Sequence, residues 1–460
     1  MGAVPSAAPS SHHGVFSPPY TLTSLGLLAL VVFNAFESMA VTTVMPVAAQ
    51  ELGGQQLYAL AFAGPMAASV IGMVLAGSWS DRRGPVGAIY ASVALFTVGL
   101  VIAGTAPTME LLVLGRIVQG FAGGANGVAL TVLVGKAYPA DLHARMFAAF
   151  AAAWVLPSIL GPYIGGLVAQ VASWHWVFLG VLILVVPALL GLVPALRRIS
   201  RDQQHAEPNR AGPYPWGRLL WAVLAAASVM GLNLSSEVPL VGWVLALAMA
   251  AVCILAIRPL IPRGTLTAQR GLPSVVLTRA IGSAAFFGTE VYLPKVLFEI
   301  YHFEPSFAGL ALTCSAVSWG ISSGIQGRLG ATRLPHHRAV RIGSAMVAAV
   351  VVGIFLVILV QGPAWALIAV WLFGGAGMGL MFPRLSVMVL ALSRPGEQGF
   401  NSSALAMADS LGNALCVAIS GLVFAALVGT GNAYAGVFAV AAACGVAVLL
   451  IAPRTRSLVD

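Results

Sequence analysis

Four ionisable residues, Glu37, Arg116, Glu290 and Asp409, lie within long apolar stretches of the chain. A charged side chain inside hydrocarbon is costly, so such a residue is by default a candidate for ion or proton transfer. Charged residues at a helix end can instead extend their tips to water, an interpretation that suits Lys295 and Arg384 better. We therefore expect the first four residues to take part in proton coupling.

Their spacing from the ends of the apolar stretches gives two of them a common depth. Glu37 lies nine residues before Pro46, and Arg116 lies six residues after Glu110. At about 1.5 Å per helical residue, both would lie about 9–14 Å below the same surface. The carboxylate of Glu37 and the guanidinium of Arg116 could therefore pair.

Glu290 would lie at a comparable depth, because it precedes Glu299 by nine residues, whereas Asp409 lies nearer the opposite end of its stretch. Burial favours the neutral form of a carboxyl group, and a nearby arginine favours the charged form. A carboxyl group that meets these two influences in turn can take up and release protons. Our hypothesis is that Glu37 and Glu290 carry protons inward, with Arg116 tuning Glu37.

The composition indicates an integral membrane protein. Of the 460 residues, 59% are hydrophobic and only 8% are charged, which excludes a set of soluble domains. The net charge of +9 has no solvated domain to carry a nucleic-acid-binding patch. The four cysteines lack CxxC or Cys/His spacing, so we expect neither disulfides, a metal site nor another cofactor.

The elements that position these residues are about fourteen apolar spans of transmembrane length. We expect an all-α polytopic protein with two six-helix halves and an inserted pair of helices between them. The expected order is a disordered cytoplasmic tail (1–20), the first half (21–195), a cytoplasmic linker (196–216), the inserted pair (217–257), a second linker (258–272), the second half (273–453) and a cytoplasmic tail (454–460). Keeping or dropping the inserted pair changes the count but not the side on which any other loop lies.

The basic residues predict the orientation. With both ends inside, almost every Lys and Arg falls in an inner loop or toward the inner end of a span, Arg116 and Lys295 excepted. Acidic residues lie in the outer loops instead. This distribution follows the positive-inside rule, so we expect a multi-pass protein of the cell (cytoplasmic) membrane with both termini in the cytoplasm.

An internal repeat supports two halves. The segment Gly77 to Gly84 partly matches the segment Ser323 to Gly330, in which Arg328 and Gly330 align with Arg82 and Gly84. A glycine cluster in the span 109–135 likewise matches one in the span 364–392. Transporters built from repeats bind substrate at the interface between them.

The first charged loop carries a recognisable motif. Gly77, Asp81, Arg82 and Gly84 form the pattern Gly-x-x-x-Asp-Arg-x-Gly, which resembles the signature of major facilitator superfamily transporters between their second and third helices. In that family the Asp and Arg clamp the inner ends of the two halves in the outward-facing state. The resemblance therefore implies a clamp role for Asp81 and Arg82.

A second motif indicates export. Gly161, Pro162, Gly165 and Gly166 form Gly-Pro-x-x-Gly-Gly, which resembles the antiporter signature of exporters in the superfamily. From the residues alone, the small side chains predict close helix packing, and Pro162 predicts a bend.

Two further patterns match the same exporters. Leu112-x-x-Gly115-Arg116-x-x-Gln119-Gly120 resembles their fourth-helix motif, and the spacing from Glu37 to Pro46 resembles that of the fourteen-helix drug:proton antiporters, with Glu in place of Asp. The resemblance covers nearly the whole chain.

We therefore expect a secondary transporter that exports small amphipathic compounds in exchange for protons by alternating access. The candidate cavity residues are Gln119, Trp154, Tyr163, Tyr292 and Trp319. The expected partners are the substrate, protons and the lipid bilayer, with no nucleic acid, and we expect a monomer. A dedicated metabolite exporter and a proton-coupled uptake symporter remain alternatives.

Other classes fit the sequence less well. Gly135-Lys136 lacks the remaining residues of a P-loop, so an ATP-driven pump is not indicated. The histidines lie in expected loops or in the tail, which argues against an intramembrane enzyme. A channel would repeat one pore-lining span by oligomerisation, whereas this chain has unequal pseudo-repeats.

Overall fold

The chain is all-α. The computed structural model describes residues 14–18, 20–204, 216–235, 241–303 and 305–456, and no strand occurs within these ranges. The first bundle contains α1 (Thr21–Glu51), α2 (Tyr58–Arg83), α3 (Pro85–Gly104), α4 (Met109–Ala137), α5 (Ala140–Ala153), α6 (Val155–Val171) and α7 (His175–Gln204). Two helices follow, α8 (Trp216–Leu234) and α9 (Gly242–Ile257). The second bundle contains α10 (Leu272–Glu299), α11 (Pro305–Arg333), α12 (His336–Leu359), α13 (Ala364–Leu392), α14 (Gln398–Leu427) and α15 (Ala433–Ile451).

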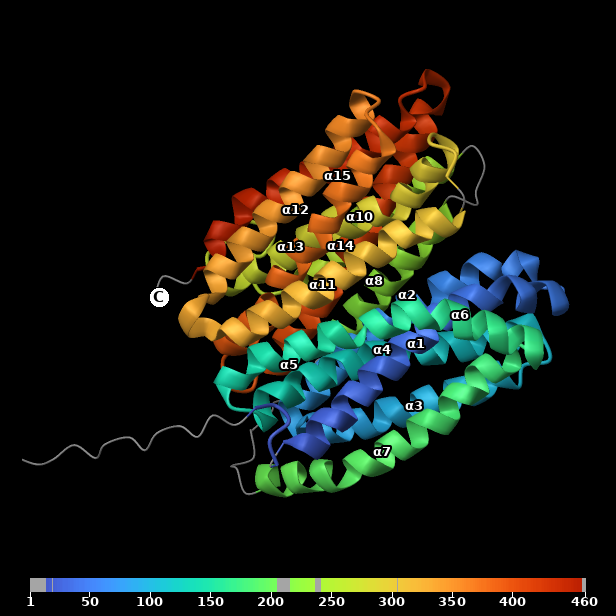
Figure 1. Ribbon diagram of the computed structural model, residues 1–460. Coiled ribbons are helices and arrows are strands. Elements are labelled where there is room, and N and C mark those ends of the chain that lie inside the picture. The colour runs from blue at the N-terminus through green and yellow to red at the C-terminus, as the bar shows by residue number, and fades with distance from the viewer. Residues whose placement is uncertain (1–13, 19, 205–215, 236–240, 304, 457–460) are drawn as a thin grey trace, which may run out of the picture.

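Each bundle has its own apolar core. One cluster of buried side chains joins α1 to α7 and reaches Val387 and Leu390 of α13, and others join the helices from α10 to α15. The ribbons of the two bundles lie close together where α5 packs on α11, and they diverge toward the opposite end (Figure 1). We call the end of the molecule that carries Asp81 the inner end, following the orientation that the basic residues predict.

Glycines bring the same pair of helices together in each bundle. A Cβ on Gly124 of α4 would overlap the carbonyl of Ser69 in α2, and one on Gly375 of α13 would overlap the carbonyl of Ser315 in α11. Such contacts require small residues at the crossing point. The glycine clusters seen in the sequence therefore have the same packing function in both bundles.

The repeated loop segments also share a backbone conformation. Gly84 follows α2 with φ of 81°, and Gly330 interrupts the end of α11 with φ of 64°. Residues with a Cβ rarely adopt this left-handed region, so glycine is needed at both turns. This parallel supports the alignment of residues 323–330 with residues 77–84.

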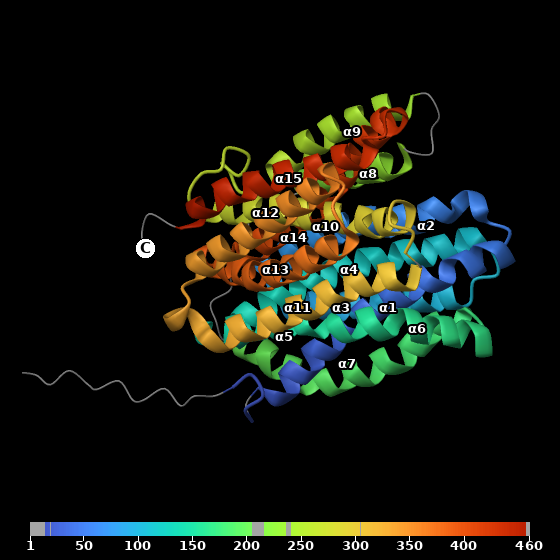
Figure 2. The ribbon, with the colours of Figure 1, turned by 45° about the horizontal axis from the view of Figure 1, so that its top comes forward.

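The pair α8 and α9 lies on one side of the molecule. Buried residues of α8 and α9 join those of α2 and α14 in one apolar cluster. In Figure 2, α9 occupies the outer edge, and α8 lies between it and α2. The pair therefore packs across the junction of the two bundles.

The expected number of about fourteen spans is not confirmed. In the described part of the chain, 12 helical segments are long and apolar enough to cross a membrane, and they include α8 and α9. The helices α7 and α11 are 30 and 29 residues long but are not among the 12. Both helices contain side chains outside the described set.

Three boundaries differ from the sequence-based expectation. The expected disordered tail 1–20 is ordered at its end, because residues 14–18 form turns in which Val15 is buried and accepts a hydrogen bond from Ser24 at 2.5 Å. Residues 1–13 lie outside the described residues. The expected linker 196–216 begins as helix, because α7 continues to Gln204, and residues 205–215 also lie outside the described residues.

The expected tail 454–460 is partly structured as well. A 3₁₀ turn covers Ala452–Thr455, and Thr455 is fully buried. The last four residues of the chain lie outside the described residues.

The apolar stretch that contains Pro157 and Pro162 is divided into two helices, α5 and α6. The interruption falls at Trp154, three residues before Pro157. Proline cannot donate to the carbonyl four residues earlier, which here belongs to Ala153. By contrast α6 continues through Pro162, so we attribute the break to Pro157 rather than to the proline of the antiporter-like motif.

Candidate functional site

Glu37 and Arg116 form an ion pair in the interior of the first bundle. Glu37 lies on α1 and Arg116 on α4, and each residue is less than a tenth exposed. Arg116 also donates a hydrogen bond of 3.0 Å to the side-chain oxygen of Gln119, one turn further along α4. The pair that the spacing suggested is present, and Gln119 completes a three-residue polar cluster.

This cluster retains unused hydrogen-bonding capacity. Nε of Arg116 and the amide nitrogen of Gln119 are buried without an acceptor among the described residues. Buried N–H groups are usually paired with protein or water. The cluster can therefore accept a further polar group, such as a water molecule or part of a substrate.

The antiporter-like motif packs α6 against α1 beside this cluster. Gly161 and Gly165 are buried, and a Cβ on Gly161 would lie 2.9 Å from the Cβ of Met39. A Cβ on Gly165 would lie 3.0 Å from the carbonyl oxygen of Ala40. Met39 and Ala40 are two and three residues from Glu37. The two glycines thus fix α6 against the turn of α1 that carries the carboxylate.

The other residues of this motif are less buried, although Gly166 still faces α1, where its Cβ would lie 3.7 Å from Cγ2 of Thr43. Pro162 and Tyr163 are exposed, Tyr163 to 71%, and Gly166 is half-buried. Trp154, at the junction of α5 and α6, is 42% exposed. The structure does not bring either aromatic side chain into contact with Glu37.

Glu290 lies on α10 and is half-buried. No hydrogen bond or ion pair involves its carboxylate in the described part of the chain. Phe287 lies one turn away on the same face of α10 and packs against Trp319 of α11. Glu290 therefore lies one turn of α10 from an aromatic cluster and has no basic partner among the described residues.

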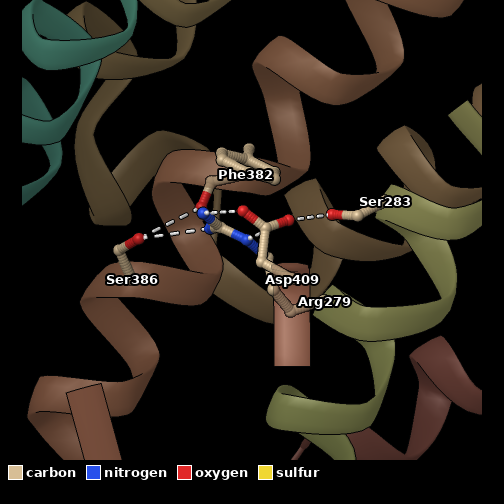
Figure 3. Close-up of polar contacts among 5 residues, drawn as sticks. All are labelled: Arg279, Ser283, Phe382, Ser386 and Asp409. Atoms are coloured by element: carbon tan, nitrogen blue, oxygen red, sulfur yellow. Dashed lines mark hydrogen bonds and ion pairs between the residues drawn. The ribbon is translucent and has the colours of Figure 1, made fainter. Parts of the chain in front are cut away.

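Asp409 has a partner that the sequence interpretation missed. Arg279 of α10 lies with its Nε 3.4 Å from Oδ1 of Asp409 on α14, and Ser283 donates a hydrogen bond to the same oxygen. Figure 3 shows the guanidinium of Arg279 between Asp409 on one side and Phe382 and Ser386 of α13 on the other. It donates to the Phe382 carbonyl at 3.2 Å and to Ser386 Oγ at 3.5 Å.

The sequence contained a signal for Arg279. It lies within an apolar span, but we grouped it with the basic residues of the inner ends because the span begins only a few residues earlier. Its side chain is instead buried, and its guanidinium carbon lies 3.0 Å from the centroid of the Phe382 ring. The second bundle therefore contains an ion pair that joins α10, α13 and α14.

The interpretation of Arg384 as a residue that reaches water is wrong. Its side chain is fully buried and donates to the carbonyls of Gln326 at 2.7 Å and Gly330 at 3.1 Å. It also donates to Nδ1 of His336 at 3.1 Å. These carbonyls lie at the end of α11, where helix hydrogen bonds run out, so Arg384 ties α11 and α12 to α13. Lys295, by contrast, is 45% exposed and pairs with Glu299.

Asp81 connects the two bundles at the inner end. Its two carboxylate oxygens accept hydrogen bonds from the backbone N–H groups of Gly399 at 2.6 Å and Phe400 at 2.8 Å, in the first turn of α14. The positive end of a helix dipole favours a carboxylate there. Gly77 allows the approach, because its Cβ would lie 2.5 Å from the Gly399 carbonyl oxygen. Arg82 is half-buried beside Asp81.

The two remaining aromatic candidates lie in different places. Trp319 packs edge-on against Phe286 and Phe382, and its indole N–H has no acceptor among the described residues. Tyr292 instead lines an open pocket of about 530 Å³ between α8, α9, α10 and α14. Because Tyr292 follows Glu290 by two residues, it points to another side of α10.

The fold and the buried charges together define a transporter-like membrane protein of two helical bundles. The sequence profile of the Major Facilitator Superfamily matches residues 27–369 and 275–459. The chain belongs to this superfamily, and it is a multi-pass membrane protein.

Several relatives are named as drug exporters. The chain is 25% identical over 416 residues to a protein of Mycobacterium tuberculosis named as a probable multidrug-efflux transporter, and the match covers 88% of each chain. It is 23% identical over 309 residues to the multidrug efflux pump SdrM of Staphylococcus aureus, covering 65% of this chain and 67% of SdrM.

Solved structures share the fold. The human organic anion transporter MFSD10 matches with a TM-score of 0.71 at 14% identity, covering 95% of this chain and 100% of that one. The proton:xylose symporter XylE matches with a TM-score of 0.65 at 16% identity, covering 93% and 94% of the two chains. At these identities the likeness concerns the fold alone.

Proposed function

We propose that this protein exports small amphipathic compounds in exchange for protons by alternating access. The observation that carries the proposal is the buried cluster of Glu37, Arg116 and Gln119, against which the antiporter-like motif packs. Burying two charges costs desolvation free energy. A buried ion pair within a membrane-spanning bundle is therefore a candidate functional site. The naming of several relatives as multidrug exporters supports the choice of substrate class.

The proton step follows from the chemistry of the cluster. Protonation of Glu37 removes its negative charge and ends the ion pair with Arg116. Arg116 is then a buried cation without a counterion, a state that favours rearrangement or binding of another group. Release of the proton restores the pair. Glu290 supplies a second carboxylate in the other bundle, and its half-buried position without a basic partner suits reversible protonation.

The contacts between the bundles support an outward-facing state. Asp81 holds α14 at the inner end, and α5 packs on α11 at the same end. For transport, these inner contacts must separate while the outer ends approach each other. The conformational change is thus a movement of one bundle relative to the other, as expected of transporters built from repeats.

We further propose that α7 and α11 also cross the membrane, which would give about fourteen spans with both termini in the cytoplasm. The division into two six-helix halves and an inserted pair is part of this proposal. The protein would act as a monomer in the cell membrane. Two central carboxylates and few other charges suit cationic amphipathic compounds.

A transport assay tests the direction. Cells with and without the protein are first screened for susceptibility to dyes, antibiotics and metabolites, and the most protected compound becomes the labelled substrate. In inside-out vesicles acidified internally, an exporter that exchanges protons accumulates this compound, and collapse of the pH gradient abolishes accumulation. Accumulation in right-side-out vesicles under an inward proton gradient would instead establish an uptake symporter.

A further inference from the structure

The inserted helix α8 lies across the seam between the two bundles. Its buried face, which includes Ala222 and Val229, shares one apolar cluster with Val70 and Val74 of α2 and with Leu411 of α14. The packing of α8 against α2 extends along much of both helices, whereas α9 packs mainly on α8. A single helix thus contacts one helix from each bundle, at the seam that must change if the inner ends separate.

A side chain of α8 reaches the residue that Asp81 holds. The guanidinium carbon of Arg218 lies 4.3 Å from the centroid of the Phe400 ring. The backbone N–H of Phe400 donates to Asp81 at 2.8 Å. The ring covered by Arg218 therefore belongs to the first turn of α14, which is fixed to α2 by the Asp81 carboxylate.

Helix stability does not explain an arginine at this position. Arg218 is the third residue of α8, and a cation in the first turn of a helix is disfavoured by the helix dipole. The face of an aromatic ring attracts a guanidinium. The contact with Phe400 is thus a favourable interaction of this side chain.

We propose that Arg218 is a positioning residue of the inner gate and that α8 braces the closed inner end. The inference rests on the proposed alternating-access function. Because α8 packs more extensively on α2 than on α14, separation of α2 from α14 would break the contact between Arg218 and Phe400. An interaction made in only one of two states shifts their populations by its own free energy. For an exposed cation–π contact the shift is about two- to five-fold.

Distance measurement between spin labels tests the inference. Ala140 at the start of α5 and Ala331 near the end of α11 are exposed, lie at the inner ends of different bundles and carry no charge. Cysteines at these two positions are labelled in full-length protein in nanodiscs. The four native cysteines, Cys253, Cys314, Cys416 and Cys444, are replaced by alanine.

We expect Arg218→Ala to raise the ratio of long to short distances about two- to five-fold. Arg218→Lys should retain most of the closed population, because it keeps a cation over the ring. In an Asp81→Asn background, Arg218→Ala should cause little further change, since the two residues act on the same turn of α14. The matched control is Arg258→Ala, which removes an exposed charge from the inner end of α9 and should leave the distances unchanged.

An unchanged distance distribution in Arg218→Ala would overturn the proposal, as would an equal shift in Arg258→Ala. A full additive effect in the Asp81→Asn background would show that Arg218 does not act through the clamp. Size-exclusion chromatography identifies any variant that fails to fold, and Arg218→Gln then replaces Arg218→Ala. The measurement uses no substrate, so its failure is distinguishable from failure of the vesicle assay.

Discussion

Three buried arginines are compensated by specific partners. Arg116 is held by Glu37 and Gln119, Arg279 by Asp409, and Arg384 by backbone carbonyls. Removing one member of a buried ion pair costs about 3–5 kcal/mol, because the other charge is left unpaired. Removing both members is often far less costly. These pairs therefore differ from surface ion pairs, which contribute little.

The Arg279–Asp409 pair allows the contribution of a buried ion pair to stability to be tested. We expect Arg279→Met to lower the apparent melting temperature by several degrees, because Asp409 would lose its cation inside the second bundle. The double variant Arg279→Met/Asp409→Asn should recover much of the loss. Thermal unfolding in detergent measures the effect. A double variant that is no more stable than Arg279→Met would show that the pair is not the source of the stability.

The sequence predicted a residue's depth in the bundle, but it did not predict whether the side chain meets water or a buried partner. The depths of Glu37 and Arg116 follow from helical rise, so their proximity could be inferred from spacing. Arg279 and Arg384 lie near the inner ends of their helices. An arginine side chain there can either extend to water or remain buried against a partner. Only the packing of α11, α13 and α14 decides between these outcomes. Aromatic residues such as Tyr292 and Tyr163 were equally ambiguous, because a bilayer-exposed face and a cavity face have similar composition.

At the scale of elements, small residues determine which helices touch. In α4, Gly124 meets the backbone of α2, whereas a Cβ on Gly127 of the same helix would meet nothing within 4 Å. The glycine clusters were visible in the sequence, but the partner helix was not. The break between α5 and α6 was likewise misplaced, because two prolines lie in one span and only Pro157 coincides with the interruption.

Alanine substitutions at Gly124 and Gly127 test whether a glycine is needed only where α4 crosses α2. We expect Gly124→Ala to destabilise the protein by about 1–3 kcal/mol, the usual cost of overpacking, because its methyl group would overlap the Ser69 carbonyl. Gly127→Ala in the same helix should be neutral. Yield of monodisperse protein and thermal unfolding report both effects. Equal behaviour of the two variants would contradict the packing seen between α2 and α4.

At the scale of the whole molecule, two bundles are joined at the inner end by the polar contacts of Asp81 with α14. The positions of the helices along the chain could be predicted, and so could the internal repeat. The location of α8 and α9 could not, because their apolar faces fit lipid or protein equally well. The seam between α2 and α14 became visible only in three dimensions.

The Asp81 contact tests the role of this seam. We expect Asp81→Asn to reduce transport strongly while leaving membrane insertion intact, since the amide has one acceptor oxygen where the carboxylate has two. Vesicle transport and size-exclusion profiles measure the two properties. Asp141→Asn, which removes an exposed acid at the start of α5, is the matched control. Normal transport by Asp81→Asn would exclude the clamp.

We propose that Glu37 and Glu290 carry the protons that drive export. The most direct measurement is substrate export by purified protein in liposomes under an imposed pH gradient, for wild type, Glu37→Gln, Glu290→Gln and the double variant. We expect the double variant to lose gradient-driven export while still binding substrate, and each single variant to be impaired. Undiminished gradient-driven export in both single variants would contradict it.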